Sequence, residues 1–382
     1  MLPFHYALRN LWRDKTRLCQ IVAGTALVVF LVMAAAALNG GMRDVLSASG
    51  SRDNVILLGI GSEDSVQRSE IPENSAGIAA TGIPGVANLL GQPAVSPEIH
   101  HMTYLTVADY APAQSMIRGI TPAALLVHPE VRLITGSFPR PGEIMIGRMA
   151  WRSLRLPDSA LAIGTQVHLE NTRLVVSGVF AAPGTVMESE IWMPLGDLRT
   201  LAGRSSLSCL TLRMTSPEGV DDADLFTKQR LDLEMTAIRE SDYYDRLNRF
   251  FQPIRVMTWI TAMLITVGAL FGGLNTLHAA FAQRVRESAT LQAIGFGRSA
   301  LLTSFMQESL LACLLGTLVG LTSALLLFDG FSVAFAIGSF TMHVTPAVAG
   351  LGLATGCVLG LLGALPAATH CLLPPLPAAL RG

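Results

Sequence analysis

The chain has 382 residues, of which 51% are hydrophobic and only 14% are charged, and its formal net charge is −1. Soluble domains typically carry about 25% charged residues. The deficit is concentrated in long uncharged stretches, as a bilayer requires of the segments that cross it. The near-zero net charge gives no indication of a nucleic-acid partner. These values indicate an integral membrane protein.

The first uncharged run, residues 18–42, follows a basic N-terminal segment, residues 1–17, which we expect to form a cytoplasmic helix. At about 1.5 Å per residue the run crosses a hydrocarbon core of ~30 Å. It is too long for the apolar part of a signal peptide, and no convincing cleavage site follows it. We predict that it is retained as the first transmembrane helix.

Residues 43–254 are predicted to form a folded α+β domain. Short segments rich in β-branched residues and bounded by Gly or Pro predict strands at 55–58, 104–107, 143–146, 166–169 and 174–179, with weaker candidates at 191–193 and 208–213. Helices are predicted at 74–81, 121–127, 147–155 and 220–231. The elements do not alternate in strict βαβ order, so we expect a mixed sheet. Residues 37–48 and 240–254 are expected to be stalk helices that continue the adjoining spans.

Three more apolar stretches predict transmembrane helices at 255–283, 299–328 and 346–369. They are separated by a loop, residues 284–298, and a short connection, residues 329–345, and are followed by a tail, residues 370–382. Basic residues gather before the first span, in the loop and at Arg381, so the positive-inside rule places both termini and the loop in the cytoplasm. The predicted fold class is an α-helical membrane protein with four transmembrane helices and an α+β extracytoplasmic (periplasmic) domain inserted between the first and second.

No catalytic motif is recognisable in the sequence. A P-loop is excluded because neither of the two lysines, Lys15 and Lys228, follows a glycine. His100 and His101 are adjacent and would point to opposite faces of a strand, which disfavours a shared metal. Cys209 is the single cysteine of the polar domain, and we interpret it as a small buried hydrophobic residue. We therefore predict no enzymatic activity, no metal and no cofactor in this chain.

The loop from Arg284 to Arg298, RVRESATLQAIGFGR, predicts a short helix that ends at Gly295 and Gly297. Leu291 lies four residues after Glu287 and shares its face. Two interpretations stay open from the pattern alone. The helix docks into a groove of a partner protein, or it lies in the lipid headgroups as an ordinary loop helix.

Glu308 is the only charged residue within the third predicted span. A charge at the bilayer centre costs about 2.5–3.5 kcal/mol on insertion scales. Either Glu308 pairs with an arginine of the loop and fixes the loop's geometry, or it extends to the membrane interface. We favour the pairing.

Glycines recur at spacing four in the last three predicted spans, and such faces let helices approach closely. They are Gly268 with Gly272, Gly316 with Gly320, and Gly352 with Gly356 and Gly360. The pattern supports a packed bundle or a dimer interface.

The segment from Arg284 to Leu314 matches the pattern R-x-x-E-x-A-x-L-x-A-x-G, followed by an arginine and by a glutamate in the next span. In this it resembles the FtsX/MacB-type permeases of ABC transporters, the mechanotransmission or type VII class. ALRNLWRDKTR near the start, GSFPRPGEIMIGRMAW and LVVSGVFAAPGTVMESEIWMPL in the outer domain, and GALPAATHCLLPPLPAALRG at the end are also similar to that family. The chain departs from the family where residues 367–370 replace the arginines that usually follow P-A.

The resemblance implies a permease subunit of the DevC or LolC kind, without a fused ATPase domain, in the bacterial inner membrane. A separate ABC ATPase subunit would bind ATP and Mg²⁺, and a second permease chain, identical or paralogous, would complete the complex. The ATPase-coupling loop would comprise Arg284, Arg286, Glu287, Leu291, Gly295, Phe296, Gly297 and Arg298. A periplasmic adaptor and membrane lipid are further implied partners. The substrate would be a lipid, lipoprotein, peptide or small hydrophobic molecule.

Two other classes of function compete with this interpretation. A membrane-anchored sensor with an extracytoplasmic ligand-binding domain would share the layout, but the predicted cytoplasmic segments are too short for an output domain. A membrane enzyme would need a catalytic motif, and none is recognisable.

Overall fold

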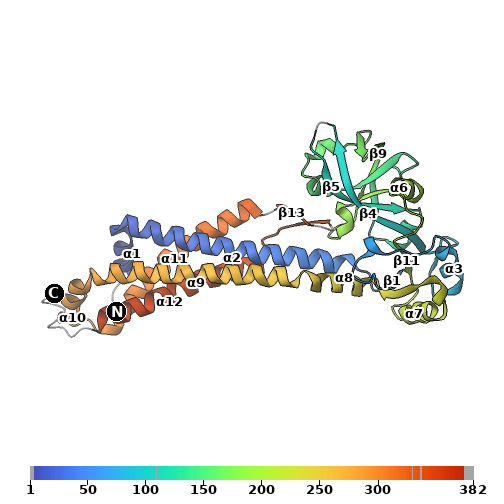
Figure 1. Ribbon diagram of the computed structural model, residues 1–382. Coiled ribbons are helices and arrows are strands. Elements are labelled where there is room, and N and C mark those ends of the chain that lie inside the picture. Colours follow the sequence, from blue (N-terminus) through green and yellow to red (C-terminus); the bar gives the residue numbers. More distant parts are fainter. Residues whose placement is uncertain (1–3, 109, 329, 336–337, 374–382) are drawn as a thin grey trace. The chain divides into compact units, whose positions relative to one another are not determined.

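The structure is a computed structural model that describes residues 4–108, 110–328, 330–335 and 338–373 (Figure 1). The chain divides into two compact units. The helical unit comprises Met1–Gly40, Pro253–Phe331 and Met342–Gly382, and the sheet unit comprises Gly41–Gln252 and Ser332–Thr341. The backbone therefore passes between the two units four times.

The helical unit contains α1 (Phe4–Arg13), most of α2 (Lys15–Ser49) and of α9 (Gln252–Ala282), α10 (Val285–Ala293), α11 (Arg298–Phe328) and α12 (Pro346–Leu372). Four of these, α2, α9, α11 and α12, are long and apolar enough to cross a membrane, which confirms the prediction of four apolar helices. The expected N-terminal helix is divided at Asp14, whose Oδ1 accepts a hydrogen bond from the backbone N–H of Arg17 (3.1 Å) and so caps α2.

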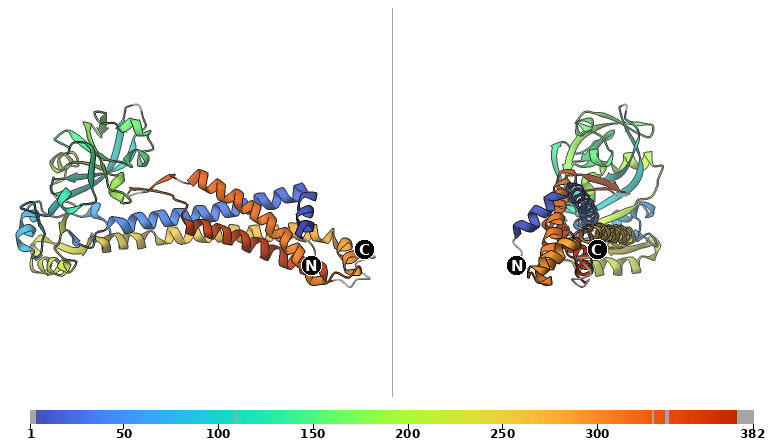
Figure 2. Two further views of the ribbon diagram at one scale, coloured as in Figure 1. Left: turned by 180° about the vertical axis from the view of Figure 1, so that it is seen from behind. Right: turned by 90° about the vertical axis from the view of Figure 1, so that its left-hand side faces the viewer.

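Helices α11 and α12 run side by side in the helical unit (Figure 2), and glycines allow their close packing. A Cβ atom at Gly316 would lie 2.7 Å from the carbonyl oxygen of Val22, and one at Gly320 would lie 2.7 Å from that of Ala26. Gly352 of α12 likewise abuts α2, and Gly356 and Gly360 abut α11. In contrast, nothing lies within 4 Å of a Cβ atom at Gly268 in α9. The glycine faces of α11 and α12 are thus packed within the chain, whereas that of α9 is open.

The sheet unit is built on ten strands, in the order β12-β1-β11-β4-β5-β10-β7-β9-β6, with β8 pairing both β4 and β9. Their bounds are β1 (Asn54–Gly59), β4 (Val95–Val107), β5 (Ala113–Ile120), β6 (Arg132–Gly136), β7 (Glu143–Gly147), β8 (Gln166–Leu169), β9 (Thr172–Ala181), β10 (Ile191–Pro194), β11 (Cys209–Arg213) and β12 (Met235–Arg239). Two pairings, β10 with β5 and β7 with β9, are parallel and the others are antiparallel. The predicted mixed sheet is therefore confirmed.

Strand β4 joins two parts of this sheet. Its first four residues pair with β11, and its remainder pairs with β5 and β8. Because β8 also pairs with β9, strands β4, β5, β10, β7, β9 and β8 close into a ring. Strands β1, β11 and β12 extend from it beside α3 (Ser75–Gly82), α7 (Gly219–Gln229) and α8 (Glu240–Phe250). Trp192, Phe180 and Ile117 on these strands are fully buried, Ile117 in the main core cluster and the two aromatic residues in a second one.

Several predicted elements need correction. The strand predicted at 104–107 is only the end of β4, and β5, β6 and β12 were not predicted. The helix predicted at 147–155 is short, α5 (Ala150–Ser153), and α4 (Ala124–Val127) fills only the second half of 121–127. The connection expected at 329–345 contains a hairpin, β13 (Ser332–Phe335) and β14 (Gly338–Thr341), that belongs to the sheet unit. There Ser189 Oγ lies 2.5 Å from Ser339 Oγ, and Arg152 donates to Ser332 Oγ (2.8 Å).

Glycine packing in the helical unit is tested by matched substitutions. Gly320→Ala should destabilise the detergent-solubilised chain by about 1–3 kcal/mol, because the added methyl group overpacks the contact between α2 and α11. Gly268→Ala adds the same group where space is open. Thermal unfolding of both variants checks this. Equal stability of the two variants would contradict the packing described here.

Candidate functional site

The carboxylate of Glu308 is buried in the helical unit, with 3% of its side chain exposed. Arg284 Nη1 lies 2.9 Å from Oε2 and 3.2 Å from Oε1, and Arg17 Nη2 also donates to Oε1. Both guanidinium groups are themselves largely buried. Hydrogen bonds between ionised groups are the strong ones, so this cluster, the Glu308 clamp, links three segments: the start of α2, the residue before α10, and α11.

The predicted pairing of Glu308 with a loop arginine is present, and the partner is Arg284. The second partner was missed. In the sequence Arg17 is only one of several basic residues before the first span. No local pattern identifies it, since it lies 291 positions from Glu308.

The loop forms helix α10, and the structure places its predicted coupling residues in two different environments. Arg286 is exposed, and Glu287 pairs with Arg13 of α1 at 3.0 Å. Leu291, however, is partly buried and packs against the cluster around Phe281 and Phe305. Leu291 therefore lies on the bundle side of α10, while Glu287, one turn earlier, is exposed.

The accessible apolar residue of the loop is Ile294, which is 70% exposed. With Arg286 and Thr290 it forms a stripe at spacing four, which brings the three side chains onto one face of the helix. We call this set the exposed stripe. Gly295 then adopts φ +110°, which a residue with a side chain rarely adopts, and Phe296, Gly297 and Arg298 lead into α11.

A buried ion network lies in the sheet unit, where the ring meets strands β1 and β11. Arg118 on β5 donates to both carboxylate oxygens of Glu190 (2.7 Å each) and to Glu98 Oε2 (2.9 Å). Glu98 Oε1 lies 3.2 Å from His128 Nε2. Burial alone would raise the pKa of Glu98, but Arg118 and the two histidines that contact it hold that pKa well below its ordinary value.

His128 is the second cation of the network. Burial opposes its protonation, but contacts with Glu130 and Glu98 raise its pKa to about 10. The carboxylates of the network therefore face two positive charges, one from Arg118 and one from His128.

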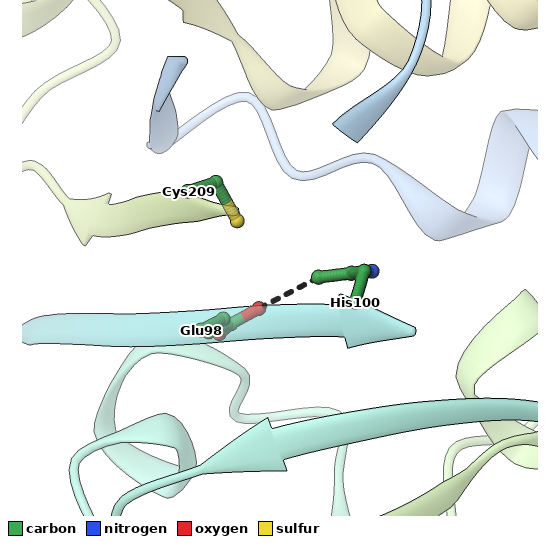
Figure 3. A group of neighbouring side chains, drawn as sticks. All are labelled: Glu98, His100 and Cys209. Carbon is green, nitrogen blue, oxygen red and sulfur yellow. Dashed lines mark hydrogen bonds and ion pairs between the residues drawn. The ribbon is translucent and has the colours of Figure 1, made fainter. Parts of the chain in front are cut away.

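Glu98, His100 and Cys209 place three potential metal-ligand atoms within 4.8 Å of one another (Figure 3). Both oxygens of Glu98 are already engaged, however, by Arg118, His128 and His100. A cation here would have to displace a buried guanidinium. Cys209 is buried beside Ile56 and Ile238, where burial raises its pKa well above the ordinary value, so it sits as a neutral thiol. The group belongs to the ion network, and His101 has a different partner, Glu170 (3.7 Å).

The sheet unit also joins the end of α2 to the start of α8. Glu240 Oε2 accepts hydrogen bonds from the backbone N–H of Ser51 (3.1 Å) and from Asn54 Nδ2 (2.9 Å). A Cβ atom at Gly50 would lie 2.6 Å from Ser241 Cα, so only glycine fits this approach. We call this contact the Glu240 clasp. It fixes to one another the two chain ends that enter and leave the domain.

Comparison with known proteins finds two family models that match successive parts of the chain. Residues 21–224 match the MacB-like periplasmic core domain, and residues 259–372 match the FtsX-like permease C-terminal region. The first match alone covers more than half of the 382 residues.

Two curated relatives are named as macrolide export ATP-binding/permease proteins. MacB 1/2 of Paracoccus denitrificans is 29% identical over 193 residues, 47% of this chain and 28% of that protein. MacB of Escherichia coli O157:H7 is 25% identical over 244 residues, 59% of this chain and 36% of that protein. The matches thus cover about a third of these relatives' length.

Solved structures give weaker likenesses. The periplasmic region of MacB from Actinobacillus actinomycetemcomitans matches 54% of this chain and 94% of that one, with a TM-score of 0.39 and 11% identity. The extracellular domain of the noncanonic ABC-type transporter YknZ from Gram-positive bacteria matches 48% and 99%, with a TM-score of 0.37 and 15% identity.

Removing the acid of the Glu308 clamp leaves two buried guanidinium groups without their carboxylate. Glu308→Gln should therefore destabilise the chain by about 3–5 kcal/mol. The control is Gln307→Ala, at the exposed neighbouring position. Thermal unfolding in detergent compares the two variants, and a Glu308→Gln variant as stable as the control would refute the clamp.

His128 makes a pH-dependent contribution to stability. Because its pKa rises from 6.5 to about 10 on folding, the contribution is fully present below pH 6.5 and is lost as the pH rises through about 10. His128→Gln should lower the free energy of unfolding by a few kcal/mol at pH 6, and the difference from the parent chain should shrink toward pH 10. A pH series of unfolding midpoints measures this, with His101→Gln as the control. A pH-independent difference would rule out a charged His128.

Proposed function

The chain belongs to the family of FtsX/MacB-type permeases, and from that premise we propose that it is the permease subunit of an ATP-driven ABC transporter. A separate ATPase subunit would bind ATP and Mg²⁺ and hydrolyse the nucleotide, and this chain would convert the resulting motion into movement of its sheet unit. The observation that carries the proposal is the exposed stripe on α10, held next to the Glu308 clamp.

The exposed stripe is suited to docking. An isoleucine that is 70% exposed beside an arginine offers an apolar anchor and a charge, the combination that dominates many protein interfaces. Glu287 and Leu291 hold the helix in place, one through Arg13 and the other through the bundle. We propose that the ATPase contacts Arg286, Thr290 and Ile294, while the remaining loop residues set the position of α10.

Transmission would follow the covalent and ionic connections of the chain. The Glu308 clamp ties the loop to α2 and α11, and the sheet unit receives the chain at four points, including both ends of the hairpin β13–β14. The Glu240 clasp joins the end of α2 to the start of α8, so displacement of either helix reaches the domain through one joint.

A second permease chain would cover α9. In its most apolar window only 6% of the residues are buried, compared with 33–44% in the other three apolar helices. The open Gly268 and Gly272 face would permit close approach of a second copy. Without a second chain, this apolar part of α9 would face lipid.

The topology we propose places the sheet unit between the first and second spans and outside the cytoplasm, with both termini and α10 inside, in a bacterial inner membrane. Relatives named for macrolide export favour a small hydrophobic substrate over the other candidates, which are lipids, lipoproteins and peptides. For export, we propose a periplasmic adaptor protein as a further partner.

The test is co-purification of the tagged chain with its ATPase from native cells. Ile294→Asp should reduce recovery of the ATPase about tenfold or more, since loss of an interface hot spot costs about 2 kcal/mol or more. The control Gln283→Asp adds the same charge just before the loop, at an exposed position outside the stripe. Leu291→Ala should lower thermal stability instead.

Recovery of a P-loop ATPase that is unaffected by Ile294→Asp would refute the stripe as the docking surface. If no ATPase co-purifies with the unsubstituted chain under mild conditions, the permease proposal fails and the sensor alternative is favoured.

A further inference from the structure

Helix α8 bears a hollow of about 400 Å³ that the transport mechanism does not use. Side chains at spacings of three and four along the helix form most of its wall. The lining residues are Asp64, Tyr243, Arg246, Leu247, Arg249 and Phe250. The Tyr243 hydroxyl accepts a hydrogen bond from the backbone N–H of Val66 (3.5 Å), which fixes the segment of Asp64 against the helix. The hollow is thus built from two parts of the sheet unit.

Charges in the hollow are uncompensated. Within the described part of the chain, Arg246, Arg249 and Asp64 form no ion pair and no side-chain hydrogen bond with one another or with other residues. The two guanidinium groups lie three positions apart on one helix, and their planar donors match the oxygens of a phosphate. Asp64 supplies the one carboxylate among the lining residues, and it can accept hydrogen bonds from a cationic group. The set is complementary to a ligand with a phosphate and a positively charged amine.

The apolar part of the wall has the character of a membrane-interface site. Phe250 is 72% exposed, and its ring packs edge-on against Phe251 (centroids 5.4 Å apart). Tyr and Trp side chains concentrate where a protein crosses the lipid headgroups, and Tyr243 belongs to the same wall. An exposed phenylalanine beside two arginines is unfavourable in water alone but well placed beside acyl chains and phosphates.

Position in the chain limits the distance to the bilayer. Phe250 lies six positions before Val256, the first residue of the uncharged run, and these six steps span at most about 22 Å even when fully extended. The headgroup layer accounts for the difference between the ~30 Å core and the ~40–45 Å full bilayer. Residues 252–256 belong to helix α9, so they rise only about 6 Å, and the two steps from Phe250 to Gln252 add at most about 7 Å. With the uncharged run in the hydrocarbon core, the hollow therefore lies at or just outside the headgroup layer.

We infer that this hollow binds the headgroup of a membrane phospholipid that carries both a phosphate and a primary amine, as phosphatidylethanolamine does. Arg246 and Arg249 hold the phosphate, Asp64 accepts hydrogen bonds from the ammonium group, and Leu247 and Phe250 contact the first part of the acyl chains. The inference requires that α9 enters a membrane and is independent of any coupling to an ATPase.

Native mass spectrometry of the delipidated full chain in detergent tests the inference. Phosphatidylethanolamine, phosphatidylglycerol and phosphatidylcholine with identical short acyl chains are titrated separately, and the lipid bound per chain is counted. The unsubstituted chain should bind one phosphatidylethanolamine more tightly than either of the others. The double substitution R246Q/R249Q should weaken that binding about tenfold or more, because both charge-assisted contacts are lost.

Asp64→Asn separates the two halves of the site. It should remove the preference for phosphatidylethanolamine over phosphatidylglycerol while phosphate binding persists. Arg132→Gln and Asp221→Asn, exposed positions elsewhere on the sheet unit, are the matched controls and should bind as the unsubstituted chain does.

Three results would overturn the inference. The first is binding by the double variant that equals that of the controls. The second is an unsubstituted chain with no preference among the three headgroups. The third is competition by soluble glycerophosphoethanolamine at the same concentration as the lipid, because the acyl chains would then contribute nothing. Thermal unfolding confirms that each variant is folded, and ATPase co-purification, measured in parallel, distinguishes this site from the permease function.

Discussion

The Glu308 clamp is the interaction on which the rest of the helical unit depends. A carboxylate within an apolar helix is tolerated because two guanidinium groups surround it. Each arginine comes from a different segment, so satisfying one charge also fixes the start of α2, the residue before α10 and the middle of α11. The exposed stripe, Arg286, Thr290 and Ile294, is therefore presented on a helix whose position is set by ionic contacts. A loosely attached short helix would move alone when a partner displaces it and would not move α2 and α11 with it.

The sheet unit is also held by buried ionic contacts, together with a closed ring of strands. Its ring of six strands is closed by pairing between neighbouring strands, and at the junction with β1 and β11 the buried Arg118 donates to both Glu190 and Glu98. The Glu240 clasp then connects this junction to the helices leaving the domain. Four passages of the backbone between the units, including the hairpin β13–β14, give displacement several routes into the domain. The lipid site proposed on α8 would place a headgroup beside one of these routes.

Parts of this arrangement could be read from the sequence, for physical reasons. Bilayer-length apolar runs identify the four long helices, and the cost of an isolated charge in a span predicts that Glu308 has a partner. The identity of Arg17 was not predictable, because 291 residues separate it from Glu308 and no periodicity connects them. Strand β5 was missed because its buried Arg118 interrupts the apolar pattern of a strand. The nine residues of α10 do not determine how the helix contacts the bundle, so the sequence does not distinguish the inward-packed Leu291 from the exposed Ile294.

The central claim is that ATP-driven motion at α10 reaches the sheet unit through the Glu308 clamp. Spin labels at Tyr104 on the ring and Leu326 on α11, both exposed, with Cys19 and Cys357 replaced by serine, would report the distance between the units by double electron–electron resonance in the complex with the ATPase. The account predicts a distance distribution that changes on ATP binding and reverts on hydrolysis, and that stays unchanged in Glu308→Gln. A complex that hydrolyses ATP while the distribution remains constant would contradict it.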